Sequence, residues 1–215
     1  MSNKKKRALA YAAILVAIVV VDQVVKYFVK TNMYIGQDIP LIGTWCHLHF
    51  VENEGFAFGA SFGGLVGKMV LTTFRVVCSA FIVWVLYKQF KGNGRTSLIA
   101  SLTLILAGAI GNLIDNCFYG LIYSESYYHV ATLFPPEGGY APLFQGRVVD
   151  MFHFPLFEFD WPQWIPLIGG NHFEFFSAIF NVADIAITVG VFWLLIEFAF
   201  LAPRAEKTLK DEKKA

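Results

Sequence analysis

The sequence has little charge and no cysteine framework, and both absences narrow its class. Only 15% of its 215 residues are charged, and the formal net charge is +1, against about 25% charged residues in an average soluble domain. A net charge this small provides no bulk attraction for nucleic acid, so we expect no nucleic-acid partner. The three cysteines Cys46, Cys78 and Cys117 are odd in number and follow no metal-binding or redox spacing, so we expect them to be packing residues.

The sequence instead contains long runs of apolar residues. The sequence is 56% hydrophobic with a mean hydropathy of +0.55. Four runs are close to the roughly 20 residues that a helix needs to cross a bilayer: about 8–29, 69–87, 97–119 and 177–201. They predict an all-α polytopic membrane protein with four transmembrane helices in one domain. We expect the first run to be an uncleaved span, because its first part, residues 8–21, is followed by Asp22 and Gln23 in place of a small-residue cleavage site, and apolar residues then resume through Val29.

Basic residues indicate how the spans are oriented. Lysines and arginines gather before the first run, between the second and third, and in the mixed-charge tail 202–215. The positive-inside rule places these segments, and with them both termini, in the cytoplasm. The long connections 30–68 and 120–176 then face outward.

Carboxylates inside the apolar runs are the strongest functional signal, because a charged group within the bilayer is costly. Asp184 follows Asn181 at a spacing of three, which on one helix puts both on the same face. Asp115 follows Asn112 at the same spacing. In the predicted topology Asp22, Asp115 and Asp184 all fall within roughly 10 Å of the outer boundary. We therefore expect a polar site just below the outer membrane surface.

Asp22 has a second reading. Lys26 follows it by one helical turn, and a buried carboxylate needs a partner to stay charged. A structural pair between Asp22 and Lys26 is the first interpretation, and a catalytic role for Asp22 the second.

The outward segments add a strand and an apolar cover. Residues 45–51 alternate and are rich in strand-forming side chains, which predicts a strand, and residues 52–59 beyond them suggest a turn. Residues 120–176 contain 15 aromatics and six prolines, so we expect an enlarged cap that lies on the membrane interface or covers the site. Within this cap Asp150 precedes an aromatic segment, residues 152–159, and is the best-placed partner for Asp184.

Two aspartates at a water-accessible membrane edge suggest acid–base hydrolysis. Close carboxylates share one proton, so one can activate water while the other protonates a leaving nitrogen. This chemistry needs neither a metal nor another cofactor. Three alternatives remain open: a small proton-coupled transporter using the intramembrane carboxylates, a metalloenzyme using histidines such as His47 and His49, which can share a strand face, and a non-catalytic assembly subunit.

Five short motifs occur in a fixed order: Asp22-Gln23-Val24-Val25-Lys26, Asn53-Glu54-Gly55-Phe56-Ala57-Phe58-Gly59, Gly111-Asn112-Leu113-Ile114-Asp115, Val148-Val149-Asp150 and Phe180-Asn181-Val182-Ala183-Asp184. Together with the four-span layout they resemble the motif set of lipoprotein signal peptidase, also called signal peptidase II. The resemblance covers nearly the whole chain, and five motifs in order are highly specific.

The resemblance implies an aspartic endopeptidase of the bacterial cytoplasmic (inner) membrane. It also implies a small extracytoplasmic β-cradle between the first two spans, which agrees with the strand expected at 45–51. Such enzymes cleave diacylglyceryl-modified prolipoproteins before the lipidated cysteine, work among membrane lipids and are the target of globomycin. It implies Asp150 and Asp184 as the catalytic dyad and Asp22 and Lys26 as supporting residues. The residues implied to shape the substrate and inhibitor site are Asn53, Gly55, Asn112, Asp115 and Asn181.

The chain departs from the family pattern at two places. Asn116 stands where the family usually has arginine, and we hypothesise that Arg147 or Arg75 compensates. The segments 116–149 and 151–176 are also long for the family, which fits an enlarged outer cap.

Overall fold

A computed structural model describes residues 2–54, 64–92 and 94–201. These residues form two compact units. The helix unit draws on described residues within 1–23, 63–114 and 182–215, and the sheet unit on those within 24–62 and 115–181. Each unit is described by itself.

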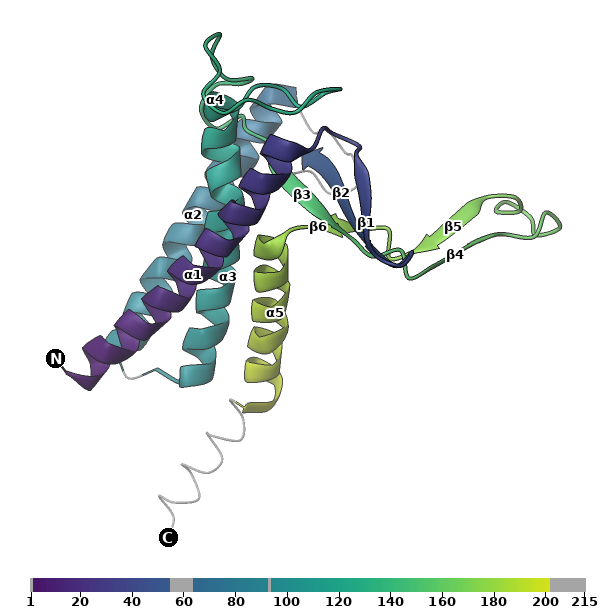
Figure 1. Ribbon diagram of the computed structural model, residues 1–215. Coiled ribbons are helices and arrows are strands. Elements are labelled where there is room, and N and C mark those ends of the chain that lie inside the picture. Colours follow the sequence, from purple (N-terminus) through teal and green to yellow (C-terminus); the bar gives the residue numbers. More distant parts are fainter. Residues whose placement is uncertain (1, 55–63, 93, 202–215) are drawn as a thin grey trace. The chain divides into compact units, whose positions relative to one another are not determined.

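The described residues include four helices that are long and apolar enough to cross a membrane. They are α1 (Asn3–Asn32), α2 (Gly64–Lys91), α3 (Thr96–Ile114, continuing to Ile122) and α5 (Val182–Ile196, continuing to Ala199). Together with a small antiparallel sheet, these helices confirm the predicted four-helix membrane architecture. Figure 1 shows the long helices and the strands of the smaller sheets.

Small residues allow α3 and α5 to pack closely within the helix unit. A Cβ atom added at Gly108 would lie 2.2 Å from the backbone oxygen of Ala183, and one added at Gly190 would lie 2.9 Å from the backbone oxygen of Ser101. Because lipid is as apolar as leucine, such close contact stabilises a helix pair more than hydrophobicity does. Helices α2 and α3 are joined by a small buried cluster, which consists of Leu86 of α2 with Ile99, Leu102 and Leu106 of α3.

A four-stranded antiparallel sheet organises the sheet unit, with the order β1-β2-β3-β6. Its strands are β1 (Asp38–Ile42), β2 (Cys46–Asn53), β3 (Val148–His153) and β6 (Ile179–Phe180). The predicted strand at 45–51 is therefore confirmed as β2. Val149 and Met151 on β3 are fully buried, so this strand lies at the centre of the unit.

The cap contains a second, two-stranded sheet. Strands β4 (Phe157–Asp160) and β5 (His172–Phe175) pair as a hairpin, which projects away from the four-stranded sheet (Figure 1).

Two predicted boundaries are wrong at the residue level. The last helix begins at Val182 and not at 177, because Ile179 and Phe180 pair with β3 as strand β6. Isoleucine and phenylalanine are as apolar in a strand as in a membrane helix, so hydropathy alone does not separate the two. The third helix changes at Asp115 into a π-helix, η2 (Asp115–Tyr119), before one last turn, α4 (Gly120–Ile122).

Candidate functional site

The first turn of α5 positions Asp184 in the helix unit. Asp184 is the third residue of α5, where a carboxylate interacts favourably with the positive end of the helix dipole. The side-chain amide of Asn112 on α3 donates a hydrogen bond to Asp184 Oδ1 at 2.8 Å. Asn112 and Asp184 therefore lie at one level of α3 and α5.

Asp22 of α1 caps the same helix end. The backbone amide of Ala183 donates to Asp22 Oδ1 at 2.8 Å, and Gln23 Nε2 donates to Asp22 Oδ2 at 3.2 Å. The first amides of a helix have no partner within it, so a carboxylate at this point satisfies one of them. Gly111 makes the approach possible, because a Cβ atom there would lie 2.7 Å from Asp22 Oδ2. Asp22 thus has a structural role at the residue next to Asp184.

Strand β3 positions Asp150 in the sheet unit. Its side chain is buried, with only 3% of the residue exposed. Asn181 donates from Nδ2 to Asp150 Oδ1 at 2.6 Å and lies 3.3 Å from the Val149 carbonyl oxygen. The prediction that Asn181 shares a helix face with Asp184 is wrong, because Asn181 lies between β6 and α5 and its side chain is directed to β3.

A buried ion pair supports the same strand. Lys26 Nζ lies 2.7 Å from Asp115 Oδ2, and both side chains are fully buried. Asp115 Oδ2 also accepts a hydrogen bond of 3.2 Å from the Val149 amide, directly before Asp150. The structure thus gives Lys26 an ion pair with Asp115, a carboxylate 89 positions further along the chain that helical spacing does not identify. The predicted pair of Lys26 with Asp22 stays a prediction.

A charged network that the sequence analysis did not identify lies beside the ion pair. Glu52 forms ion pairs with Lys30 and with Arg147, whose Nη1 lies 3.0 Å from Glu52 Oε2. The same Nη1 atom lies 2.8 Å from Glu125 Oε2. Burial opposes the charge of Arg147, but hydrogen bonds to Glu125 and Glu52 outweigh burial and raise the pKa of Arg147 above its ordinary value. The signal in the sequence was the position of Glu52, one residue before the Asn53 motif.

Asn53 of strand β2 is the remaining predicted site residue that the structure describes. Asn53 is the last residue of β2 and pairs with Val148 of β3. Gly55 lies outside the described residues. Asn116, the departure from the family pattern, is 1% exposed, and its carbonyl oxygen accepts a hydrogen bond of 2.9 Å from the Gly146 amide. Whether Arg147 compensates for the missing arginine stays a prediction.

The comparisons with known proteins point in one direction. The family model described as signal peptidase (SPase) II matches residues 14–200 of the chain. The chain belongs to the signal peptidase II family. It is therefore a membrane peptidase with four spans, and the transporter alternative is not supported.

Lipoprotein signal peptidases of two bacteria are similar to this chain over most of its length. A lipoprotein signal peptidase of Porphyromonas gingivalis is 45% identical over 204 residues, covering 94% of this chain and 87% of the relative. One from Amoebophilus asiaticus is 34% identical over 197 residues, covering 89% and 78%. A solved bacterial membrane enzyme shares the fold, with a TM-score of 0.57, 24% identity and coverage of 92% of this chain and 91% of that chain.

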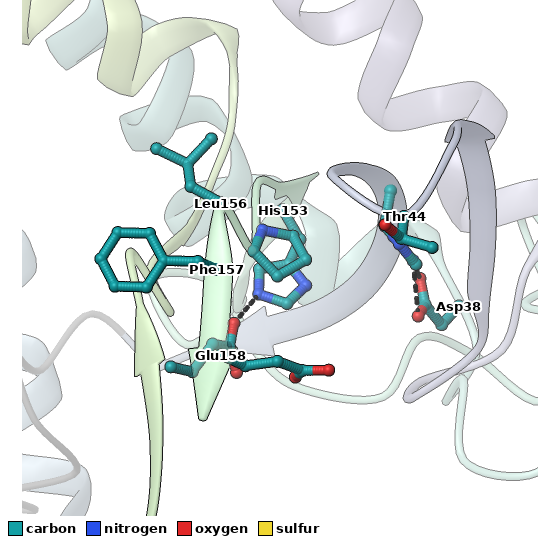
Figure 2. A pocket seen from close by; sticks show the side chains of 9 residues that line it. Asp38, Thr44, His153, Leu156, Phe157 and Glu158 are labelled. Atoms are coloured by element: carbon teal, nitrogen blue, oxygen red, sulfur yellow. Dashed lines mark hydrogen bonds and ion pairs between the residues drawn. The ribbon is translucent and has the colours of Figure 1, made fainter. Parts of the chain in front are cut away.

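The histidines of this signal peptidase II member gather in its sheet unit. His47 and His153 are paired across β2 and β3, and both line a pocket of about 390 Å³ together with Asp38 and Glu174. Figure 2 shows Asp38 and Thr44 on one side of this pocket and His153, Leu156 and Phe157 on the other. Both histidines of the pocket contact a carboxylate: His47 Nδ1 lies 2.9 Å from Asp38 Oδ2, and His153 Nε2 lies 2.6 Å from Glu174 Oε1. Among the described residues, no three side chains of metal-binding type are placed to hold one ion.

Proposed function

We propose that this protein removes signal peptides from diacylglyceryl-modified prolipoproteins, with Asp150 and Asp184 as its catalytic dyad. The observation that carries the proposal is the matched environment of the two carboxylates. Each accepts a hydrogen bond from an asparagine amide, Asp184 from Asn112 at 2.8 Å and Asp150 from Asn181 at 2.6 Å. An asparagine does not titrate, so it holds a carboxylate in place whether or not that group carries the proton.

Chain connectivity supports the pairing of the two aspartates. Asn181, the hydrogen-bond partner of Asp150, precedes Asp184 by three residues. Three residues of extended chain span at most about 11 Å. Asn112 and Asp115 are likewise three residues apart, and they bond to Asp184 and to the Val149 amide.

The proposed reaction is a water attack on the peptide bond. The ionised aspartate takes a proton from water as the water oxygen bonds to the carbonyl carbon. The protonated aspartate then donates its proton to the leaving nitrogen as the carbon–nitrogen bond breaks. The products are a carboxylic acid, which ionises by releasing its proton to solvent, and an amine, and the dyad again holds one shared proton.

We assign supporting roles to the other predicted residues. Asp22, by capping the Ala183 amide, fixes the first turn of α5, and Lys26, by pairing with Asp115, fixes the strand segment before Asp150. Asn53 and Gly55 are proposed to contact substrate and globomycin-type inhibitors. The protein is proposed to lie in the bacterial cytoplasmic membrane with both termini in the cytoplasm and the sheet unit outside, where the lipidated cysteine is presented among membrane lipids.

The test uses full-length protein in detergent and a diacylglyceryl-modified prolipoprotein, with cleavage followed by gel shift. We expect Asp150→Asn and Asp184→Asn each to lower the cleavage rate by at least about 10²-fold, because a lost acid or base removes that much. Asp160→Asn is the matched control, since the Asp160 side chain is 76% exposed on the hairpin. A chelator should leave cleavage unchanged.

The outcomes separate the alternatives. If either dyad variant keeps a near-normal rate while eluting as folded protein, the assignment of the dyad is wrong. If wild type never cleaves the lipidated substrate, the proposed substrate class is wrong. Loss of activity in the chelator would favour the metalloenzyme alternative.

A further inference from the structure

The β4–β5 hairpin presents an aromatic face within the sheet unit, which the Trp161 ring covers only in part, beside Phe159 and Phe173. Its register pairs Phe157 with Phe175 and Phe159 with Phe173, so these four rings share one face of the two strands. The Phe157 and Phe175 rings are stacked at 4.7 Å. Phe157, Phe159 and Phe175 are nevertheless exposed. An isolated two-stranded hairpin is marginally stable in water, so a face like this one needs an apolar partner.

The opposite face of the hairpin is charged. Glu158 and Asp160 on β4 pair with Glu174 and His172 on β5. His172 lies 2.9 Å from Asp160, and Glu174 lies 2.6 Å from His153 on β3. The hairpin is therefore amphipathic across its thickness, with one apolar and one ionic side.

The tip of the hairpin, defined here as residues 161–171, is apolar and carries no charged residue. Leu167 is fully exposed and Trp164 is 80% exposed. Isolated exposed residues are ordinary, but here an uncharged tip with exposed tryptophan and leucine directly follows a strand whose aromatic side chains are also exposed.

The backbone of the tip is folded onto itself. The amides of Trp161, Ile165, Gly169, Gly170 and Asn171 all donate to carbonyl oxygens within the tip, at 2.8 to 3.1 Å. Pro162 and Pro166 have no amide hydrogen to donate. Of the nine tip amides that carry a hydrogen, five therefore have partners within the tip, and a partnered backbone group costs little free energy when it leaves water. The other four amides suit the polar headgroup region of a membrane interface, where hydrogen-bond acceptors remain.

The bilayer is the apolar phase that the chain brings close to this surface. Strand β5 ends at Phe175, and the membrane span α5 begins at Val182, seven residues later. Seven residues span at most about 25 Å. Tryptophan is also the side chain most typical of the membrane–water boundary, because its ring is apolar and its N–H is polar.

We propose that the β4–β5 hairpin is a membrane-docking element. Its aromatic face and its tip enter the outer-leaflet interface of the bilayer, and its Glu158–Asp160–His172–Glu174 face stays in water. The occupant of the surface is lipid. The inference depends on the membrane spans and not on the proposed catalytic residues.

The experiment measures the depth of a nitroxide label in the full-length protein. Cys46, Cys78 and Cys117 are replaced by alanine, Leu167→Cys is labelled, and the protein is reconstituted in phosphatidylethanolamine–phosphatidylglycerol vesicles without substrate. Power-saturation spectroscopy then compares collisions with oxygen, which concentrates in lipid, and with a water-soluble nickel chelate. Glu158→Cys, on the charged face of the same hairpin, is the matched control.

We expect the label at 167 to collide several-fold more with oxygen than with the nickel chelate, and the label at 158 to show the reverse. Equal nickel accessibility at both positions would place the tip in water and overturn the proposal. Low accessibility to both reagents at 167 would place the tip against protein, which would also overturn it.

A second measurement leaves the cysteines in place. Tryptophan fluorescence of the wild-type protein is compared with that of Trp164→Phe in vesicles of brominated phosphatidylcholine. The difference isolates Trp164, and we expect bromine atoms high on the acyl chains to quench it by at least half. A difference signal that is quenched by aqueous acrylamide and not by the brominated lipid contradicts docking.

Discussion

At the scale of single residues, direct hydrogen bonds position the carboxylates of the candidate site. Asn112 and Asn181 each donate to one aspartate, and Asp22 accepts from the backbone of α5. The sequence predicted which residues are polar and at what depth, because apolar runs make any polar residue conspicuous. It did not predict their partners, because a partner such as Asp115 for Lys26 is set by tertiary packing and not by helical spacing.

Asn112→Ala should lower kcat by about 10- to 100-fold with a smaller effect on KM. The Asn112 amide orients Asp184 at 2.8 Å, and a hydrogen bond to a charged group contributes about 1.5–3 kcal/mol. Steady-state cleavage of a lipidated prolipoprotein measures both constants. Asn171→Ala on the exposed hairpin tip is the control. A wild-type kcat in Asn112→Ala would show that Asn112 does not orient Asp184 for catalysis.

Lys26→Met should destabilise the protein by about 3–5 kcal/mol. Removal of one member of a fully buried ion pair leaves the other charge, here Asp115, without its counterion. Thermal unfolding in detergent, followed by size-exclusion elution after heating, measures the loss. Lys88→Met, at an exposed position, serves as the control. Equal unfolding temperatures for the two variants would show that the Lys26 pair contributes nothing to stability.

At the scale of elements, hydropathy predicted the existence of every long helix but not where the last one begins. A run such as residues 177–181 is equally suited to a strand and to a membrane helix, and pairing with β3 decides in favour of the strand. The π-helix at Asp115 was not foreseen either, because no composition signal marks it. The hairpin β4–β5 was predicted only as an aromatic cap, since register depends on pairing partners that lie 12 residues or more apart.

Gly108→Val tests the packing of α3 against α5. A Cβ atom at 108 would lie 2.2 Å from the Ala183 carbonyl oxygen, a backbone atom that moves only if the helices separate. Overpacking of this kind costs about 1–3 kcal/mol, so we expect a clearly lower unfolding temperature and, because Ala183 adjoins Asp184, reduced cleavage. Ala80→Val on the exposed side of α2 should change neither quantity. Normal stability of Gly108→Val would argue against this close contact.

The ion pair between His172 and Asp160, at the base of the hairpin tip, makes the stability of the hairpin depend on pH. A hydrogen bond to Asp160 raises the pKa of His172; desolvation opposes this rise, and the charges of Asp160 and Glu158 add to it. Because the folded pKa lies above the unfolded one, the pair stabilises the hairpin fully below the ordinary histidine pKa of about 6.5 and loses its effect as pH rises through the folded value.

NMR titration of histidine-labelled protein measures this effect directly. Asp160→Asn should move the midpoint of His172 toward lower pH, because the largest contribution to the rise is removed. Leu167→Ala on the same hairpin, at a position without ionisable contacts, should leave the midpoint in place. An unchanged midpoint in Asp160→Asn would contradict the assigned cause.

At the scale of the whole molecule, the order of motifs along the chain carries most of the functional prediction. Asp150 belongs to a strand of the sheet unit and Asp184 to a helix of the helix unit, and each is held by an asparagine of its own unit. Hydropathy separates membrane from extramembrane segments well, so the location of the site was predictable. The ionic contacts within the sheet unit were not, because Lys30, Glu52 and Arg147 come from three separate stretches of chain.

The proposed orientation of the whole chain is tested by cysteine labelling. Basic residues at the N-terminus and between α2 and α3 favour the cytoplasm, so the loop that contains Tyr128 must face outward. Tyr128 is 94% exposed and Lys88 near the end of α2 is also exposed, so single cysteines at either position are reachable on their own side of the membrane. In spheroplasts, a membrane-impermeant maleimide should label Tyr128→Cys at once and Lys88→Cys only after permeabilisation. Labelling of Lys88→Cys in intact spheroplasts would reverse the orientation and put the proposed site on the side where no lipidated substrate is presented.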